Sequence, residues 1–472
     1  MRNAHSSTVD DMGYFIPSMP IPLTVRDEAD RPKFRQRMSF LQKVMKNPLE
    51  TFATVHFENP VTISKFNRST NVIMNDVKLI RHCFLDNVNN YKHSFVRQSL
   101  LKPVLGDGLL TIEGEPWKKS RKVIAPIFIP RNVNGFADIM KRTCVDYLDN
   151  LRVGEDITMV SSKMSELTYL ILSETLFSGE INEDADDMLK EVAYLLDNIG
   201  RPGIMDMLRV PLWVPRLTKL TALRSIYKFR KIIAKTIRKR KQAIAEGRDV
   251  PEDFLTLLLN AEADGNRLSL KSVEDNILTF IAAGHETTAR AVTWNLYLLS
   301  KSERFRERVE AEIDAFDMEA VSPSEWINHL PWTTACFEET MRLYPPAAMI
   351  TRAAVDDDEF EGYKIPKGSQ IILAPWILHR HHTLWEHPER FDPERFFGEN
   401  RDKIDRFAYL PFGVGPRVCI GARFAMQEGV IIMAMLLKHY RFDYAGKAPP
   451  WPVLKITLQP DNEMPMKVTQ RK

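Results

Sequence analysis

The chain has 472 residues, of which 44% are hydrophobic and 27% are charged, and its formal net charge is +3. These are the values of a globular protein; they exclude disordered and fibrous classes and give no reason to expect nucleic-acid binding. Four cysteines are too few for a disulfide framework, and no run of about 18 apolar residues offers an integral membrane anchor, so we expect a cytoplasmic protein.

The first third of the chain mixes short strand-like runs with helical ones. β-branched and apolar residues predict strands at Thr51–His56, Val61–Ser64 and Asn71–Met74, followed by a helix near Val77–Leu85. From about residue 131 to residue 302, apolar residues recur at spacings of three and four. This spacing predicts an almost wholly helical region.

Short strands return in the last third, at Tyr363–Ile365 and Gln370–Ala374. An irregular stretch rich in Pro, Arg and Phe precedes a final helix over about Ile420–His439, and alternation in Leu454–Leu458 predicts one more strand. The sequence therefore predicts a mainly α protein with small β-sheets, of the α+β class. Because we find no internal repeat and no low-complexity linker, we expect residues 1–472 to form a single domain.

Three features allow more than one interpretation. Residues 204–220 are rich in Met, Pro, Trp and Leu, which fits a packed connection or a mobile flap over a pocket. The basic run 224–248 is typical of a solvated helix, with nucleic-acid or membrane contact as the alternative. Four histidines cluster without the regular spacing of a zinc site, so we favour ordinary structural roles for them: His379, His381, His382 and His387.

The strongest signal for chemistry is the segment from Phe412 to Gly421. Its glycines and proline predict a tight loop, and Cys419 follows where a helix begins. A helix N-terminus favours a thiolate, which is the form of cysteine that ligates metal. A lone cysteine is more often an ordinary buried residue. This segment, however, resembles the haem-ligand loop Phe-x-x-Gly-x-x-x-Cys-x-Gly of the cytochrome P-450 family at every fixed position, including Gly413.

Further segments resemble the same family in the same order. Glu339 and Arg342 match its Glu-x-x-Arg helix, where positions i and i+3 share one face, and Arg395 lies in a segment similar to the one that completes the ion network. The resemblance implies that these three residues are structural and hold the core behind the haem.

Residues 283–288, inside a long helix predicted over about 272–300, resemble the family's dioxygen-binding segment. A glycine within a helix costs about 1 kcal/mol relative to alanine, so Gly284 beside Ala283 suggests that room is left for dioxygen; the alternative is a neutral helix irregularity with a surface glutamate. The resemblance assigns to Thr287 a hydroxyl for the distal oxygen and to Glu286 the acid of a proton path. His285 is not expected to ligate the iron.

The two haem propionates need cations or strong donors. Trp117 and Arg121, four apart on a predicted helix, resemble the family's Trp-x-x-x-Arg. Arg352 lies ten residues before Gly362, and Arg417 lies two before the ligand cysteine, both at positions similar to propionate-binding arginines of the family. Each of these residues alone is typical of an ordinary protein surface. Together they predict a site that binds the propionates of haem b.

The resemblance implies a helical triangular prism that encloses one haem. Its β-richer parts are expected at about 1–130 and 350–380, its helical body at about 131–345, and its ligand loop with the last helix at about 405–440. The implied reaction is monooxygenation, in which one atom of O2 enters a hydrophobic substrate. The apolar stretch 347–350 favours a hydrophobic small molecule. Two alternatives remain: a peroxygenase that uses hydrogen peroxide, and a haem sensor without turnover.

The sequence holds no flavin or nicotinamide fingerprint and no cysteine set for an iron–sulfur cluster. Electrons from NAD(P)H are therefore expected only indirectly, through a separate ferredoxin or flavodoxin with its reductase. A basic face that an acidic donor recognises is expected at Lys118, Lys119, Lys122 and Arg417. We expect the protein to be a monomer.

Overall fold

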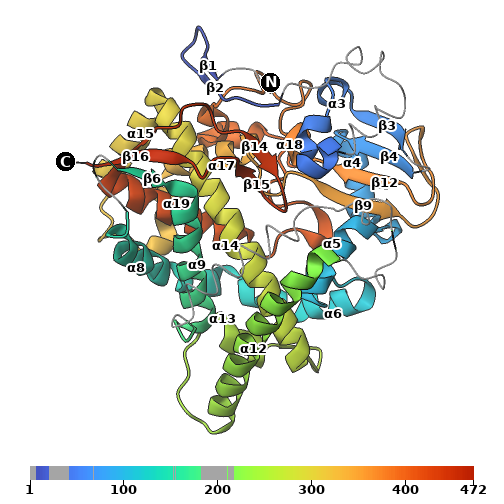
Figure 1. The fold of residues 1–472 in the computed structure, drawn as a ribbon, viewed down its shortest axis with the longest axis vertical. Helices are drawn as coiled ribbons and strands as arrows, with labels where there is room; N and C mark the ends of the chain where they lie inside the picture. The colour runs from blue at the N-terminus through green and yellow to red at the C-terminus, as the bar shows by residue number, and fades with distance from the viewer. Residues whose placement is uncertain are drawn as a thin grey trace.

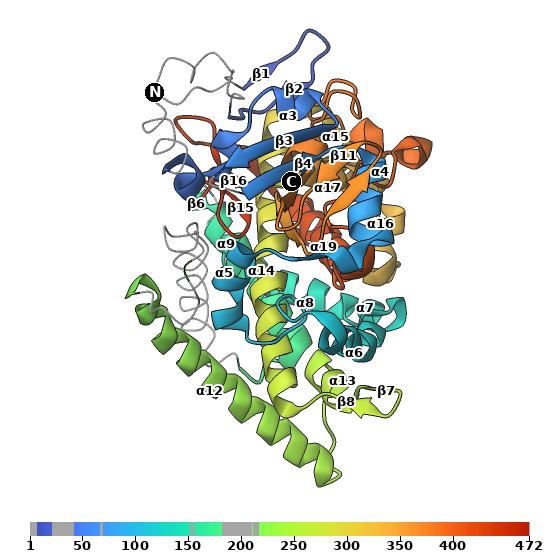
Figure 2. The same cartoon turned by 90° about the vertical axis from the view of Figure 1, so that its right-hand side faces the viewer.

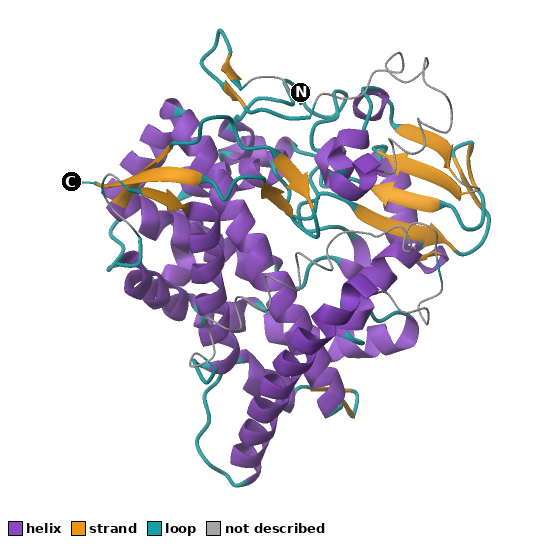
Figure 3. Cartoon of the chain, in the orientation of Figure 1, coloured by secondary structure: helices purple, strands orange, loops and turns teal. Residues whose placement is uncertain are grey.

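The computed structural model describes residues 7–20, 42–66, 69–151, 154, 156–181, 210 and 217–471. Helices dominate these residues, and the strands gather mainly along one end of the molecule (Figure 3). This confirms the predicted α+β class. The segment 204–220, expected as a connection or a flap, falls mostly outside the described residues.

A long central helix organises the helical body. α14 (Leu270–Lys301) begins at an N-cap, Ser269, whose side chain accepts a hydrogen bond from the backbone N–H of Ser272. It runs through the middle of the molecule in Figure 2, with α12 (Leu217–Ala245) crossing outside it. α9 (Val160–Phe177) packs along α14, and α8 (Ala137–Leu148), α17 (Pro331–Leu343) and α19 (Ala422–His439) complete the bundle.

The largest sheet joins strands from the first and the last third of the chain. Its order is β3 (Val61–Phe66), β4 (Ser69–Met74), β12 (Gln370–Leu373), β9 (Ile350–Ala354) and β5 (Tyr91–His93). β4 and β12 pair in parallel, and the other neighbours are antiparallel. The sheet lies beside α4 (Val77–Arg81) in Figure 1. Because His93 pairs directly with Arg352, these two side chains share one face of the sheet.

Two predicted strands were wrong. Thr51–His56 is not extended: Pro48 starts a 3-10 turn, Pro48–Thr51, and α3 (Val55–Glu58) follows. Leu454–Leu458 is not one strand but the turn of a hairpin, in which β14 (Pro452–Leu454) pairs with β15 (Leu458–Pro460). The helix expected near 77–85 is present as α4 and continues as a π-helical turn, His82–Asp86.

A second sheet has the order β13 (Tyr440–Tyr444), β16 (Pro465–Gln470), β6 (Ile157–Met159). No helix among the described residues has the length and apolar character needed to cross a membrane. The remaining elements are β1 (Thr8–Val9), β2 (Phe15–Ile16), α5 (Phe95–Leu105), α6 (Gly114–Ile124), α7 (Pro130–Gly135), α13 (Phe254–Asn260), β7 (Glu262–Ala263), β8 (Asn266–Arg267), α15 (Glu303–Ala315), α16 (Trp326–His329), β10 (Asp358–Phe360), β11 (Tyr363–Ile365) and α18 (Pro375–Leu378).

Candidate active site

The cysteine loop is a tight, glycine-turned segment that ends at α19. Gly413 and Gly415 both have φ of 75°, a conformation that favours glycine. The backbone N–H of Cys419 donates to the carbonyl oxygen of Phe412 at 2.9 Å, and Gly421 is the N-cap residue of α19. A Cβ on Gly415 would overlap the carbonyl oxygen of Phe84, so the π-helical turn His82–Asp86 packs directly against the loop. Sequence reasoning did not foresee this turn.

Cys419 differs from the other three cysteines, because it is exposed whereas Cys83, Cys144 and Cys336 are buried. Partial burial within the loop raises the pKa of the Cys419 thiol, and the N–H of Gly421 and the Arg121 guanidinium act in the opposite direction. A cation bound at the sulfur would further favour the thiolate.

A cluster of cationic side chains lies beside this loop. Burial lowers the pKa of Arg97 and Arg417 to about 10 and that of Arg352 to about 9. Nearby guanidiniums lower each of these pKa values further, whereas the carboxylate of Glu113 raises all three. Arg352 is buried and Arg97 and Arg417 are half-buried. These three guanidiniums facing one carboxylate form a site that fits a group with two carboxylates, as haem has.

Sequence motifs predicted two of these three arginines. Arg97 follows His93 by four residues at the start of α5, outside every motif, and its Nε is buried with no hydrogen-bond partner in the described part of the chain. Burial and the three guanidiniums hold the pKa of His93 far below its usual range. Because no spacing signals Arg97, His93 or Glu113, only the folded arrangement reveals them.

α6 contributes the other predicted donors. Arg121 donates to the carbonyl oxygen of Val418 at 3.0 Å, which ties α6 to the cysteine loop. The guanidinium of Arg417 lies 4.3 Å from the ring centroid of Trp117 and donates to the carbonyl oxygen of Ile112 at 2.9 Å. The structure therefore brings Trp117, Arg121 and Arg417 together.

α14 presents different residues to its two sides. Ala283 is exposed and Thr287 half-buried, and the Thr287 hydroxyl donates to the carbonyl oxygen of Ala283 at 2.7 Å. His285 and Glu286 are buried. His285 Nδ1 lies 2.7 Å from the carbonyl oxygen of Ile281, which is consistent with its expected structural role. The structure thus places Glu286 and Thr287 on different sides of the helix.

Gly284 has a packing role that the sequence did not predict. A Cβ at this position would lie 3.2 Å from a methyl group of Leu172, on α9. The missing side chain therefore lets α9 approach α14 closely. The sequence argument for a space near dioxygen did not anticipate this contact, because the partner helix lies more than a hundred residues away.

The three residues of the expected ion network meet in the core. Arg342 donates to both carboxylate oxygens of Glu339, at 2.6 and 2.8 Å, and both side chains are fully buried. Arg395 Nε lies 3.7 Å from Glu339. Arg342 also donates to the carbonyl oxygen of His379 at 2.6 Å, which links α17 to the segment that leads to the cysteine loop.

The histidine cluster makes separate hydrogen bonds. His379 Nε2 accepts from the backbone N–H of Leu410 at 2.8 Å, and burial lowers its pKa to about 3. His381 Nε2 lies 3.0 Å from the carbonyl oxygen of Asn59. Both rings therefore join distant backbone segments.

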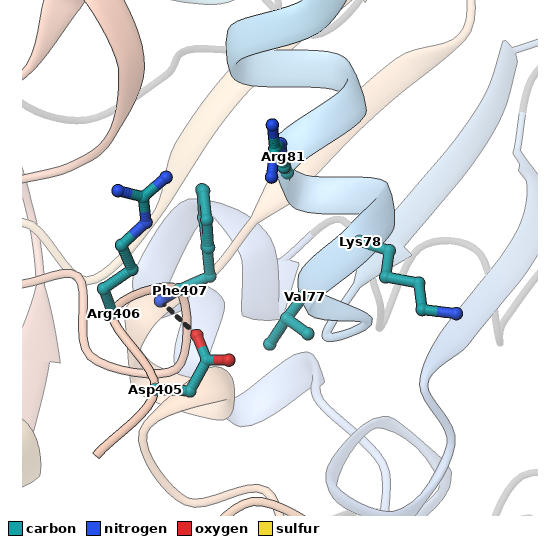
Figure 4. A pocket seen from close by; sticks show the side chains of 6 residues that line it. All are labelled: Val77, Lys78, Arg81, Asp405, Arg406 and Phe407. Carbon is teal, nitrogen blue, oxygen red and sulfur yellow. Dashed lines mark hydrogen bonds between the residues drawn. The ribbon is translucent and has the colours of Figure 1, made fainter. Parts of the chain in front are cut away.

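The expected basic face is only partly present. Arg417 turns toward Trp117 and does not belong to it, which corrects the prediction. Lys118 pairs with Glu115 at 2.7 Å, and Lys122 pairs with Asp264. Other cations flank a shallow surface pocket between α4 and the loop 405–407 (Figure 4). Its lining residues are Val77, Lys78, Arg81, Asp405, Arg406 and Phe407.

The sequence model of the cytochrome P450 family matches residues 34–466. This chain is a cytochrome P450. It is 30% identical over 394 residues to cytochrome P450 4V2 of Rattus norvegicus, covering 79% of this chain and 75% of that protein. It is 31% identical over 361 residues to putative cytochrome P450 132 of Mycobacterium bovis, covering 73% and 76%.

The P450 is also 28% identical over 405 residues to protein LUTEIN DEFICIENT 5, chloroplastic, of Arabidopsis thaliana, covering 82% of this chain and 67% of that protein. The crystal structure of the cytochrome P450DA heme domain has a TM-score of 0.76 at 24% identity, covering 88% of this chain and 90% of that one. This likeness shows the P450 fold. Family membership makes the chain a haem-thiolate monooxygenase that uses O2.

Proposed function

We propose that this P450 inserts one oxygen atom from O2 into a C–H or C=C bond of a hydrophobic small molecule. The observation that carries the proposal is the composition of the loop 412–421. One exposed cysteine, Cys419, stands two residues from Arg417, which belongs to a largely buried cluster of three guanidiniums, two half-buried and one buried. A metal-ligating sulfur and a site for two carboxylates in one place fit haem b, iron protoporphyrin IX.

In this proposal, Cys419 is the iron ligand, and Arg97, Arg352 and Arg417 bind the propionates with Arg121 and Trp117 beside them. When bound, haem supplies an iron that activates dioxygen, so that one oxygen atom reaches the substrate and the other leaves as water. The ion network of Glu339, Arg342 and Arg395 has no part in the chemistry; it holds α17 against the segment that precedes the cysteine loop.

Thr287 is the proposed donor on the open side of α14. Its hydroxyl is held by the carbonyl oxygen of Ala283, so its position is fixed relative to the helix. The carboxyl of Glu286 replaces the proton that leaves through Thr287. Neither the peroxygenase nor the sensor needs this pair.

Electrons come, in this proposal, from NAD(P)H through a reductase and a separate ferredoxin or flavodoxin. We further propose that residues 1–472 act as a single catalytic domain and a monomer in the cytoplasm. The basic residues 118, 119 and 122 on α6 support an acidic donor.

Thr287→Ala tests the reaction class. It should still bind haem, substrate and O2, whereas product per electron consumed falls and peroxide rises, since general acid–base steps contribute about 10²–10⁴-fold. Thr293→Ala is the control, because the Thr293 hydroxyl makes the same bond to the carbonyl oxygen four residues earlier but is fully buried. Unchanged product per electron in Thr287→Ala contradicts the role proposed for this residue. Full activity with hydrogen peroxide alone contradicts the proposed monooxygenase reaction.

A further inference from the structure

A short N-terminal arm, residues 7–20, packs onto the body of the protein. Its strands β1 and β2 lie at the top of both views (Figures 1 and 2). These residues precede the range 34–466 that the family model matches, so that match does not account for them. The arm nevertheless reaches the main hydrophobic core, to which it contributes three buried side chains: Tyr14, Phe15 and Met19.

Tyr14 joins two other segments of the chain. The guanidinium carbons of Arg304 and Arg390 lie 4.9 and 5.2 Å from its ring centroid. Its hydroxyl donates to Glu394 Oε2 at 3.1 Å. Contacts between a guanidinium and an aromatic ring are stabilising, and more so where water is excluded. The tyrosine therefore ties α15, which carries Arg304, to the segment 390–394.

Two further contacts fasten the arm to the same segment. Asp10 Oδ2 forms an ion pair with Arg390 Nε at 2.5 Å, and the backbone N–H of Phe391 donates to the carbonyl oxygen of Phe15 at 2.9 Å. Asp10 is itself held in place, because its other carboxylate oxygen accepts from two backbone N–H groups of the arm, those of Met12 and Tyr14. The arm thus binds the segment through its backbone, a charge and a ring.

The segment that the arm holds also contacts the buried ion network. Arg342 donates to the carbonyl oxygen of Arg390 at 2.8 Å, and the backbone N–H of Asp392 donates to Glu339 Oε1 at 2.9 Å. An outward movement of residues 390–392 would break both bonds and leave two buried charges with fewer partners, which is costly. The arm lies on the segment and keeps it against these charges.

The ion network leads on to the cysteine loop. Arg342 donates to the carbonyl oxygen of His379 at 2.6 Å, and His379 Nε2 accepts from the backbone N–H of Leu410 at 2.8 Å. The carbonyl oxygen of Leu410 accepts from the N–H of Gly413, inside the loop that carries Cys419, at 3.1 Å. A contiguous set of hydrogen bonds therefore runs from the arm to the loop, and such a set can carry coupling between the two.

We infer that residues 10–16 form a latch that sets how long the protein retains its haem. The latch holds the segment 390–394 against the ion network, and the network holds the cysteine loop. Tyr14 is its main positioning residue, and it acts through the segment. The inference rests on the proposed ligation of haem by Cys419 and adds a remote part of the chain that controls haem retention.

The rate of haem release tests the latch. Haem-loaded wild type, Tyr14→Phe and Tyr14→Ala are each mixed with an excess of apomyoglobin, and the first-order rate of haem transfer is measured by absorption. Tyr14→Phe loses only the hydroxyl bond to Glu394, so it should release haem roughly 2–10-fold faster. Tyr14→Ala also loses both guanidinium contacts and the buried ring, so its release should be roughly 10–100-fold faster. Equal rates in the three proteins overturn the inference.

Amide hydrogen exchange of the same haem-loaded proteins gives a readout that needs neither haem transfer nor activity. In Tyr14→Ala the peptide that spans residues 387–397 should exchange roughly tenfold faster or more, because the segment opens locally and the Phe391 N–H loses its acceptor. Peptides from α12, which lies at the opposite end of the molecule in both views, should be unchanged (Figures 1 and 2). Equal acceleration of both regions would mean a general loss of stability and would overturn the inference.

A double-mutant cycle tests whether Tyr14 acts through Glu394. In the Glu394→Ala background the acceptor of the tyrosine hydroxyl is gone, so Tyr14→Phe should have no further effect on haem release. If Tyr14→Phe speeds release by the same factor in both backgrounds, Tyr14 does not act through this segment and the inference is wrong.

Matched controls come from exposed positions. Tyr227→Ala removes a tyrosine of α12 that is 70% exposed and should leave haem release unchanged. Asp10→Asn keeps the oxygen that accepts from the arm's backbone but loses the charge, so it should speed release. Asp356→Asn, from the exposed pair of Asp356 with Lys367, should not. If Cys419→Ser retains haem as the wild type does, the proposed ligand fails; if only the arm variants behave as the wild type, the inference alone fails.

Discussion

Glu428 is a buried carboxyl group on α19, nine residues after the ligand cysteine. Burial raises its pKa to about 8, and a hydrogen bond with Thr288 opposes this shift. Its Oε1 has no hydrogen-bond partner in the part of the chain that the structure describes. The folded protein therefore holds this proton where the unfolded chain, with an ordinary carboxyl pKa, does not.

The consequence is a pH-dependent stability with a defined sign. At low pH, Glu428 is protonated in both the folded and the unfolded chain and does not change the free energy of unfolding. Because its pKa is raised only in the folded protein, the free energy of unfolding falls as pH rises from about 4.5 to about 8. The slope is about 1.4 kcal/mol per pH unit at most. Glu428→Gln should raise the thermal unfolding midpoint clearly at pH 8.5 and little at pH 4.5. An equal effect at both pH values contradicts the raised pKa.

At the scale of residues, the sequence predicted those groups whose spacing is fixed by one local segment. Cys419, Glu339 with Arg342, and Trp117 with Arg121 belong to such segments. Arg342 pairs with Glu339, and Arg121 donates to the backbone carbonyl next to Cys419. Arg97 could not be found, because its neighbours in the cluster come from different elements. The sequence also could not predict where the Glu286 side chain lies, because its position depends on contacts with α9.

At the scale of elements, the contact between the cysteine loop and the π-helical turn gives the clearest prediction. Gly415 and Gly362 both have positive φ, at 75° and 86°. A Cβ on Gly415 would overlap the backbone of Phe84, whereas a Cβ on Gly362 would meet nothing within 4 Å. Both alanine variants bear a conformational cost of about 1–2 kcal/mol, but only Gly415→Ala also displaces the loop.

Gly415→Ala should therefore reduce haem content and the thiolate signal in the ferrous carbon monoxide spectrum, while Gly362→Ala keeps both. Equal haem content and equal spectra in the two variants would remove the role we give to the π-helical turn.

Elements with strong periodicity were predicted well, and those set by tertiary contacts were not. The long helix expected over 272–300 is α14, because its apolar pattern persists for many turns. The 3-10 turn at Pro48 and the hairpin of β14 and β15 were missed. Short segments contain too few residues to distinguish one period from another.

At the scale of the whole molecule, the sheet joins strands from residues 61–93 with strands from residues 350–373. Sequence reasoning found β-rich regions at both places but had no means to pair them, since strand pairing over that separation leaves no local trace. The pairing places His93 beside Arg352 and so assembles the cationic cluster.

The donor surface is also a property of the whole molecule. Exposed charges mainly set encounter rates and their dependence on salt. Lys118→Glu with Lys119→Glu should slow reduction by an acidic donor at low salt and leave substrate binding unchanged. The matched control reverses Lys235 and Lys239, two exposed lysines on α12, with the same change in net charge. Equal slowing by both pairs would indicate a net-charge effect and no docking face on α6.

The central claim is that Cys419 is the ligand of the haem iron. The most direct test is the absorption spectrum of the reduced, carbon monoxide-bound protein in the wild type, in Cys419→Ser and in Cys144→Ser, whose cysteine is buried. The red-shifted band of thiolate-ligated haem should be present in the wild type and in Cys144→Ser and absent in Cys419→Ser. A band that survives in Cys419→Ser would contradict the assignment.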